Sequence, residues 1–417
     1  MFGCPSLGSL WQSRSKASAS RFVRQEDLDS AARLASEDMQ KWDQTRMICV
    51  RDLQEASRNA GRVQLVKDRK FADELVAVKR MPSTWMTRGP KDFEAAHPHA
   101  SERPWVDLAL TWVLSERMDY PHTCRFQGIF AGGDEIMVAL TFCDGGDLFQ
   151  WCYREEAEVG LARERAMRPI VAQVVSAVRW LHDLGVAHRD ISLENVMLAG
   201  SGNGSQVKLI DFGMATLRRR TKNEVRGKLS YQAPEVHILD YEVDTFIADN
   251  FSLGVVIFIM AAQDYPWAST MPGSCQLFDY IAHYGFRRFL AKRRVRKSRD
   301  IALLDVISNE LRATLASLLQ VRPSLRASCG EKAFEDQVRR KRRTSVWDTE
   351  WMLGCCAFLP YGPPSVGAED MREGKSDVER KYSSTSMKSD PSSVMSWKFS
   401  SFEKDLQFDR QRMEQTA

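Results

Sequence analysis

The stretch VAHRDISLENVML, residues 186–198, decides how this chain is interpreted. It places an aspartate, Asp190, and an asparagine, Asn195, five residues apart, with Ser192 between them. The stretch lies inside a long region of helical spacing, which short apolar runs interrupt at 196–198 and 207–210. The sequence therefore predicts a polar loop followed by two short strands within an otherwise helical segment.

The rest of the chain divides at a glycine pair that follows residue 144. Before it, five segments have the composition of short strands: RMICVRDL, RVQLV, LVAVKR, RFQGIF and EIMVALTF. Helical spacing recurs at 105–118 and, near the N-terminus, from Glu26 to Trp42. About 100 β-rich residues thus precede about 180 α-rich residues, and we predict an α+β protein with two lobes.

Composition favours a globular core and excludes several classes. Hydrophobic residues make up 43% of 417 residues, and the net charge is only +4, so we expect no nucleic-acid partner. The longest apolar run, Phe251–Ala262, is too short to cross a bilayer, and we expect no membrane partner. Nine scattered cysteines indicate reduced thiols in a cytoplasmic or nuclear protein, while the basic N-terminus also permits organelle targeting.

Several separate motifs occur in one order and together resemble a protein kinase, of the Ser/Thr type, over residues of about 47–328. LVAVKR holds Lys79, HRDISLEN holds Asp190 and Asn195, and LIDFG holds Asp211. The resemblance implies a two-lobed fold, with an antiparallel β-rich N-lobe and a larger helical C-lobe. The expected domains are an extension at 1–45, disordered and then helical, an N-lobe at 46–143, a C-lobe at 144–328 and a mostly disordered tail at 329–417.

The resemblance also assigns chemistry to these four side chains. Lys79 would pair with the α- and β-phosphates of ATP, and Asp190 would accept the proton of the substrate hydroxyl. Asn195 and Asp211 would hold Mg²⁺, with Mn²⁺ as a possible substitute. Cations around the transferred group neutralise its negative charges with little covalent help from the protein.

Six further residues are expected, from the resemblance, to line the nucleotide site. Leu140 would stand beside the adenine pocket, Asp147 would bind the ribose, and Met197 would lie under the adenine ring, although core packing explains Leu140 and Met197 equally well. The others are Gly61, Val63 and Ala77 on the first strands. The glycine-rich loop is poor: ASRNAGRV keeps Gly61, while Ala56 and Arg58 take the first two glycine positions and Ala60 the position of an aromatic cap.

The acidic partner of Lys79 departs from the family pattern. Counting back from Pro121, the expected glutamate position is Thr111. Asp107 lies four residues earlier, on the same face of a helix. We therefore predict a helix one turn longer than usual, with Asp107 as the partner of Lys79.

A second departure concerns Ser192. Ser/Thr kinases carry a lysine there, and a threonine before the APE motif faces it; here the threonine position is Lys228, in GKLSYQAPE. One hypothesis is a swap, in which Lys228 supplies the charge and Ser192 the hydroxyl. The alternative is two independent losses in a weakened enzyme.

Other residues are expected to stabilise the fold or to control whether the enzyme is active. The resemblance implies a buried ion pair between Glu235 and Arg326 and an anchoring role for Asp249. Glu224 occupies the usual phosphothreonine position, so a permanent pairing with Arg189 and Arg218–Arg220 would give constitutive activity. A solvated Glu224 is the alternative, and Thr216 and Thr221 remain alternative phosphorylation sites.

The substrate is expected to be a protein, with arginine upstream of its target hydroxyl because of Asp147 and Glu194. In the tail, RRKRRTSV offers Ser345 as an autophosphorylation or pseudosubstrate site; a nuclear-localisation signal or a solvated charge run explains the same residues. We predict an ATP-dependent Ser/Thr protein kinase. The alternative is a pseudokinase that binds nucleotide or acts as a scaffold, because of the poor glycine-rich loop and Ser192. The oligomeric state stays open.

Overall fold

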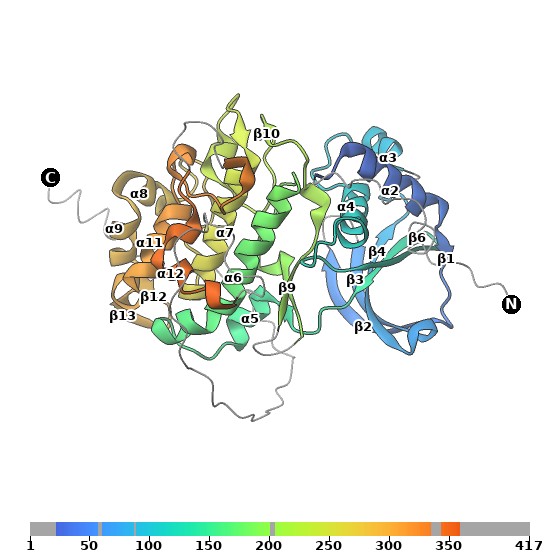
Figure 1. Cartoon of the computed structure of the whole chain (residues 1–417), viewed down its shortest axis with the longest axis horizontal. Helices are drawn as coiled ribbons and strands as arrows, with labels where there is room; N and C mark the ends of the chain where they lie inside the picture. The colour runs from blue at the N-terminus through green and yellow to red at the C-terminus, as the bar shows by residue number, and fades with distance from the viewer. Residues whose placement is uncertain (1–21, 57–60, 87–88, 201–204, 335–342, 359–417) are drawn as a thin grey trace, which may run out of the picture. The chain divides into compact units, whose positions relative to one another are not determined.

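The structure is a computed structural model that describes residues 22–56, 61–86, 89–200, 205–334 and 343–358 (Figure 1). All of these belong to one compact unit, Met1–Pro360, and the second unit, Tyr361–Ala417, contains none of the described residues. Within the first unit, strands predominate up to Thr141 and helices predominate after it. The predicted α+β fold, with a β-rich N-terminal lobe and a helical C-terminal lobe, is confirmed.

A six-stranded sheet forms the small lobe, in the order β1-β5-β6-β4-β3-β2. Neighbouring strands are antiparallel, except that β1 pairs parallel to β5. Alternate residues of the strands face one side and form a buried core that includes Val66, Val76, Val78 and Met137. The strands are β1 (Gln40–Lys41), β2 (Met47–Ala56), β3 (Gly61–Asp68), β4 (Glu74–Pro82), β5 (Phe126–Gly132) and β6 (Glu135–Thr141), and η1 (Arg69–Phe71) joins β3 to β4.

Three helices lie on one side of this sheet: α2 (Gln25–Glu37), α3 (Pro90–Ala96) and α4 (Pro104–Glu116) (Figure 1). Proline at the first position of α4 suits a helix start, where its missing N–H and fixed φ cost nothing. The small side chains Ala31, Ala32 and Ala35 on α2 are buried, and α2 packs against α4. An ion pair of 2.7 Å between Asp27 Oδ1 and Arg117 Nη1 joins the two helices at the surface.

The N-terminal segment differs from the prediction of one helix from Glu26 to Trp42. The helix ends at Glu37, and the chain then forms β1 at the sheet edge. Trp42 N donates a hydrogen bond of 2.8 Å to Ala131 O, and the Trp42 ring meets Phe130 edge-on. The open strand edge offered hydrogen-bond partners that helical periodicity does not reveal.

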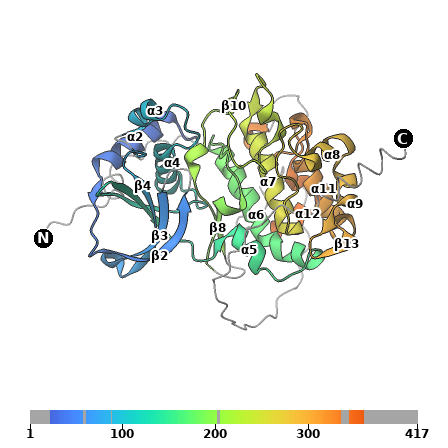
Figure 2. The ribbon, with the colours of Figure 1, turned by 180° about the vertical axis from the view of Figure 1, so that it is seen from behind.

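The large lobe is built around α7 (Thr245–Ala262), as Figure 2 shows from behind. This helix has the length and hydropathy of a membrane span, but 89% of it is buried inside the protein, which is the expected placement of a core helix. Helices α5 (Leu148–Arg154), α6 (Leu161–Asp183), α9 (Phe286–Lys292) and α11 (Asn309–Leu318) pack against it. The lobe also contains α8 (Gln276–Tyr284), α10 (Leu303–Val306) and the hairpin of β12 (Arg294–Val295) and β13 (Ser298–Ala302).

Short elements before α7 flank the loops that carry Asp190 and Asp211. β7 (Gly146–Asp147), β8 (Val196–Ala199) and β9 (Gln206–Leu209) form a three-stranded sheet in that order, and the two strands expected after residue 195 are present. The remaining elements are η2 (Leu193–Asn195), η4 (Phe212–Met214), β10 (Arg220–Thr221), η5 (Pro234–His237), β11 (Val243–Asp244) and, after α11, η6 (Pro323–Leu325).

The described part of the predicted disordered tail is ordered and packs on the large lobe. It comprises η7 (Lys332–Phe334), η8 (Val346–Asp348), α12 (Glu350–Leu353) and η9 (Cys356–Phe358). Trp347 and Trp351 are buried, and Trp351 Nε1 donates a hydrogen bond of 3.1 Å to Glu164. The sequence shows this aromatic patch at 347–358, but the polar composition around it led to the prediction of disorder; the structure packs the patch on the large lobe.

His182, on α6, joins two carboxylates in the interior. Its Nε2 lies 3.0 Å from Asp249 Oδ2 and its Nδ1 lies 2.7 Å from Glu331 Oε1. Burial alone would lower the pKa of His182, but the two carboxylates outweigh burial and raise it from its ordinary value of 6.5 to about 9.

A raised pKa makes the stability contributed by His182 complete below pH 6.5 and progressively lost as pH rises through about 9. We expect the free energy of unfolding to fall by about 3 kcal/mol across this interval from this group alone. Urea unfolding at pH 6.5 and at about pH 9 measures this fall in the free energy of unfolding. The His182→Gln variant, without the titrating group, should show a clearly smaller fall; an equal fall in both proteins would contradict the assignment.

Candidate active site

Lys79 and Asp107 meet between the sheet and helix α4. Lys79 Nζ lies 3.0 Å from Asp107 Oδ2, 3.5 Å from Asp211 Oδ1 and 3.8 Å from Glu102 Oε1. Burial alone would lower the pKa of Lys79, but the charges of the three carboxylates, Asp107 first, raise it. The contact that the helix register predicted for Asp107 is present, and Lys79 is held as a cation.

Asp107 also reaches the loop that carries Asp211. Its Oδ1 accepts a hydrogen bond of 2.8 Å from Phe212 N, while Oδ2 receives Lys79. The Phe212 side chain is buried and lies against the ring of His188. One short carboxylate therefore fixes both the lysine of β4 and the backbone beside Asp211.

Asp211 has left-handed backbone dihedrals, with φ of 64°, an uncommon conformation for a residue with a side chain. The charge of Lys79 lowers the pKa of Asp211 against the effect of burial, so the carboxylate stays ionised. Arg103 N, just before α4, donates a hydrogen bond of 2.9 Å to Gly213 O and further fixes the loop.

The buried carboxylate of Asp249, on α7, holds the loop from His188 to Asn195. The two oxygens of this carboxylate accept hydrogen bonds from His188 N (2.7 Å) and Arg189 N (2.8 Å), which is the anchoring contact implied for it. Asn195 Nδ2 donates to Asp190 O at 2.7 Å and to Asp190 Oδ2 at 3.0 Å. Both amide hydrogens are thereby used, which leaves the Asn195 side-chain oxygen as an acceptor for another group.

Lys228 and Ser192 are in contact. Lys228 Nζ donates a hydrogen bond of 2.8 Å to Ser192 Oγ and lies 2.9 Å from Glu194 Oε2. Lys228 N donates a hydrogen bond of 3.2 Å to Asp190 Oδ1. The two positions at which the sequence departs from the family pattern thus form one cluster with the carboxylate of Asp190.

The expected nucleotide-site residues of the small lobe share one face of the sheet. Val63 pairs with Lys79, and Ala77 pairs with Leu140, so these side chains alternate along β3, β4 and β6 on the same side. All four are partly exposed, in contrast to the buried residues between them. Gly61 begins β3, whereas Arg58 and Ala60 of the glycine-rich loop lie outside the described residues.

On the large-lobe side, Met197 and Asp147 are paired residues of β8 and β7. Asp147 also caps α5, because its Oδ1 accepts a hydrogen bond of 2.7 Å from Gln150 N. Burial raises the pKa of Asp147, and the nearby charge of Glu194 adds to this effect. Glu194 is therefore close to both Asp147 and Lys228.

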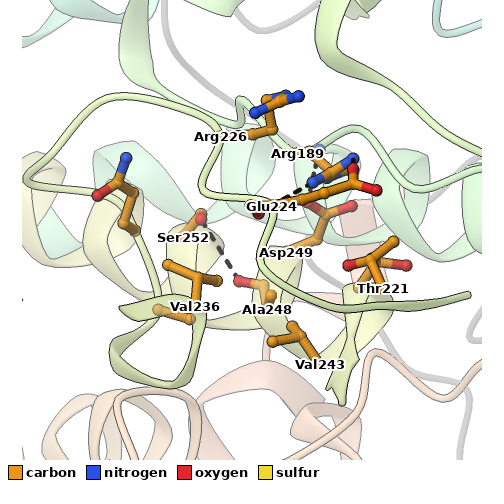
Figure 3. A pocket seen from close by; sticks show the side chains of 12 residues that line it. Arg189, Thr221, Glu224, Arg226, Val236, Val243, Ala248, Asp249 and Ser252 are labelled. Carbon is orange, nitrogen blue, oxygen red and sulfur yellow. Dashed lines mark hydrogen bonds and ion pairs between the residues drawn. The ribbon is translucent and has the colours of Figure 1, made fainter. Parts of the chain in front are cut away.

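Glu224 holds the segment of residues 211–235, which corresponds to the activation segment of the kinases that the sequence resembles. Its Oε2 lies 2.9 Å from Arg189 Nη1 and its Oε1 lies 2.6 Å from Arg218 Nη2. Figure 3 shows Glu224 directed toward Arg189 beside a small pocket that Arg226 and Thr221 also line. Burial opposes ionisation, but hydrogen bonds and charge from the two arginines lower the pKa of Glu224.

Part of the predicted arginine cluster lies elsewhere. Arg219 Nη2 and Arg220 Nη2 lie 3.0 and 3.3 Å from Asp244 Oδ2, so they do not serve Glu224. The antiparallel pairing of β10 with β11 brings Arg220 opposite Asp244 and explains this difference. The predicted pairing of Glu224 with Arg189 and Arg218 is present.

The ion pair expected in the interior is present, whereas the serine expected as a modification site in the tail is buried. Arg326 Nη2 donates a hydrogen bond of 2.9 Å to Glu235 Oε2 in the interior, as the resemblance implied. Ser345, in contrast, is fully buried and its Oγ accepts a hydrogen bond from Trp347 N, so it is not presented as a substrate or pseudosubstrate. Of the basic run, Arg343 donates to Arg326 O at 2.9 Å, and residues 339–342 lie outside the described residues.

Sequence reasoning missed Glu102 and the His182–Glu331 pair. Glu102 precedes α4, is buried, and adds a third carboxylate around Lys79. The usable signal was an acidic residue five positions before Asp107, close in sequence to the expected partner of Lys79.

Comparison with known proteins agrees with this geometry. Residues 108–337 match the family model for the protein kinase domain. The Drosophila melanogaster serine/threonine-protein kinase grp is 34% identical over 176 residues, which cover 41% of this chain and 32% of the relative. The Arabidopsis thaliana serine/threonine-protein kinase SRK2E is 30% identical over 228 residues, which cover 54% and 56%. Arabidopsis CDPK-related kinase 8 is 30% identical over 210 residues, covering 50% and 32%, so these matches span from a third to just over half of each relative.

Proposed function

The chain belongs to the protein kinase family, and from this premise we propose that it is an active, ATP- and Mg²⁺-dependent Ser/Thr protein kinase. It transfers the γ-phosphoryl group of ATP to a protein hydroxyl. The observation that carries the proposal is the convergence of Lys79, Asp190, Asn195 and Asp211, with Lys79 already ion-paired to Asp107.

The donor set fits a magnesium ion that is shared with phosphates. Mg²⁺ prefers oxygen ligands and in such sites takes one or two side chains, with phosphates and waters completing its shell. Asp211 supplies an ionised carboxylate, and Asn195 has only its amide oxygen left to offer. When bound, the ion neutralises charge on the phosphates.

Side chains of the protein bind the nucleotide and accept the proton of the substrate. Lys79, held as a cation, binds the α- and β-phosphates, while Leu140, Ala77, Val63, Gly61 and Met197 line the adenine side and Asp147 meets the ribose. Asp190 accepts the proton of the attacking hydroxyl. Hydrogen bonds from Asn195 Nδ2 and Lys228 N hold its two oxygens in place before substrate arrives.

The rival function is a pseudokinase, favoured only by the poor glycine-rich loop and by Ser192. A transfer assay with radiolabelled ATP on a peptide array decides between the two, with Asp190→Ala as the control. We expect labelling of Ser and Thr peptides far above this control. If the control and the native protein label equally while nucleotide still binds, the protein is a scaffold.

The same array reads the substrate preference. The partly buried carboxylates of Asp147 and Glu194 support a preference for arginine upstream of the target hydroxyl. Glu194 already faces Lys228, so Asp147 supplies the larger share of this attraction.

We expect the activation segment to need no phosphate. Protein treated with phosphatase should keep its activity, because Glu224 already bridges Arg189 and Arg218. The Glu224→Ala variant should lose on the order of tenfold in kcat, since Arg189 loses the contact that ties the segment to the loop. Exposed Glu242→Ala is the matched control and should be unaffected. Loss of native activity on phosphatase treatment would contradict the idea.

A further inference from the structure

Lys228 places a cation against the loop that carries Asp190, although it comes from a different element. Its backbone N–H is bound to Asp190 Oδ1, and its side chain folds over to Ser192 Oγ at 2.8 Å. Ser192 is fully buried, whereas the Lys228 side chain is 30% exposed. The ammonium is therefore anchored to a buried hydroxyl of the loop, while part of the Lys228 side chain stays exposed.

We infer that Lys228 supplies, from the activation segment, the ammonium that contacts the transferred phosphoryl group, and that Ser192 and Glu194 position it. This inference rests on the proposed kinase function. It assigns a catalytic role to a residue outside the loop that carries Asp190 and Asn195.

The loop has no basic side chain of its own for this task. Between residues 188 and 195, apart from His188, the only basic residue is Arg189, and Glu224 binds it. Lys79 is committed to Asp107, Asp211 and Glu102 on the small-lobe side. Negative charge that moves from ATP to the hydroxyl beside Asp190 needs a cation on this side too.

The contacts of Lys228 leave it able to act. An ammonium has three N–H donors. Ser192 Oγ accepts from one of them, and Glu194 Oε2 lies 2.9 Å from Nζ as an ion-pair partner. An N–H therefore remains for a phosphate oxygen, while the two partners restrict the rotamers of a side chain that is otherwise costly to order.

The arrangement also couples chemistry to the activation segment. Lys228 follows Glu224 by four residues, and Glu224 ties the segment to Arg189 of the same loop. Displacing the segment would remove the cation itself, as well as any substrate contacts that the segment makes.

Four variants test the assignment by kcat, KM for ATP and nucleotide affinity. Lys228→Met should lower kcat on the order of a hundredfold, as removal of one such donor does, with nucleotide affinity within about twofold. Lys228→Arg, which keeps the charge, should keep more activity. The exchange variant Ser192→Lys/Lys228→Thr returns an ammonium to the cluster from the other side and should recover at least tenfold of the loss. Lys222→Met, an exposed lysine of the same segment, is the control.

The positioning role of Ser192 has its own readout. Ser192→Ala should lower kcat in the native background, but it should have no further effect once Lys228 is methionine. Independent, multiplicative losses would show that Ser192 does not act through Lys228 and would overturn its positioning role. Thermal unfolding of each variant identifies misfolded protein, and in that case Lys228→Met against Lys228→Arg carries the test.

The outcomes separate the two proposals. Active native protein with near-full activity in Lys228→Met overturns this inference and leaves the kinase function standing. Native protein no more active than Asp190→Ala overturns both. A hundredfold loss with tight nucleotide binding, restored in part by the exchange, supports the assignment.

Discussion

Replacement of Arg326 by methionine should lower the free energy of unfolding by about 3–5 kcal/mol, because it leaves a buried carboxylate without its partner. Arg326 and Glu235 are both almost fully buried, and the guanidinium also donates to Ile247 O and Gln320 O. Methionine fills much of the same volume but satisfies none of these acceptors, so each keeps its desolvation penalty.

Urea unfolding, followed by tryptophan fluorescence, measures the change. Exposed Arg322→Met removes the same charge nearby and should alter stability by less than about 0.5 kcal/mol. The double variant Arg326→Met/Glu235→Leu removes both buried charges and should be more stable than Arg326→Met alone. A loss below about 1 kcal/mol in the single variant would show that the pair is solvated or replaceable.

Asp107→Ala should lower kcat/KM on the order of a thousandfold while the protein stays folded. One carboxylate holds two groups, Lys79 and the Phe212 backbone beside Asp211, and a displacement of about 1 Å of either costs roughly a hundredfold. Steady-state kinetics with varied ATP measures the loss. Because the proposed function assigns Lys79 to the phosphates of ATP and Asp211, next to Phe212, to the metal ion, KM for ATP should rise as kcat falls.

Glu102→Gln is the matched control for Asp107. Its carboxylate lies 3.8 Å from Lys79, so the loss should be tenfold or less, about the effect of one weak ion pair. Asp107→Glu restores the charge on a longer side chain and should recover part of the activity. Equal losses in Asp107→Ala and Glu102→Gln would mean that charge alone, without the Phe212 contact, is what Lys79 requires.

The sequence allowed prediction wherever a contact follows from local spacing or a motif. The position of Asp107 followed from one helical turn, and the meeting of Ser192 with Lys228 followed from two departures that compensate each other. The strands of the small lobe followed from alternation, and their observed bounds lie close to those expected. These features depend on residues that are close in sequence or on motifs that occur in the same order throughout the family.

The remaining features depend on tertiary partners that periodicity cannot reveal. Strand β1 forms because β5 offers an edge, and Trp351 is buried because Glu164 accepts its indole N–H. Ser345 lies in a basic stretch that suggests a surface site, yet its hydroxyl caps η8 inside the protein. For β1 and Trp351, a partner more than 80 residues away in sequence decides the structure. For Ser345, a local helix cap buries a residue that the basic composition around it would place at the surface.

The ion pairs of Glu224 have a consequence for how long a signal lasts. A phosphoester on this segment is erased by hydrolysis, whereas a carboxylate is part of the chain and persists as long as the protein does. Under this arrangement, opposing phosphatases have nothing to remove at this position. The lifetime of the active state would then follow synthesis and degradation of the protein, or a partner that pulls Glu224 from Arg189.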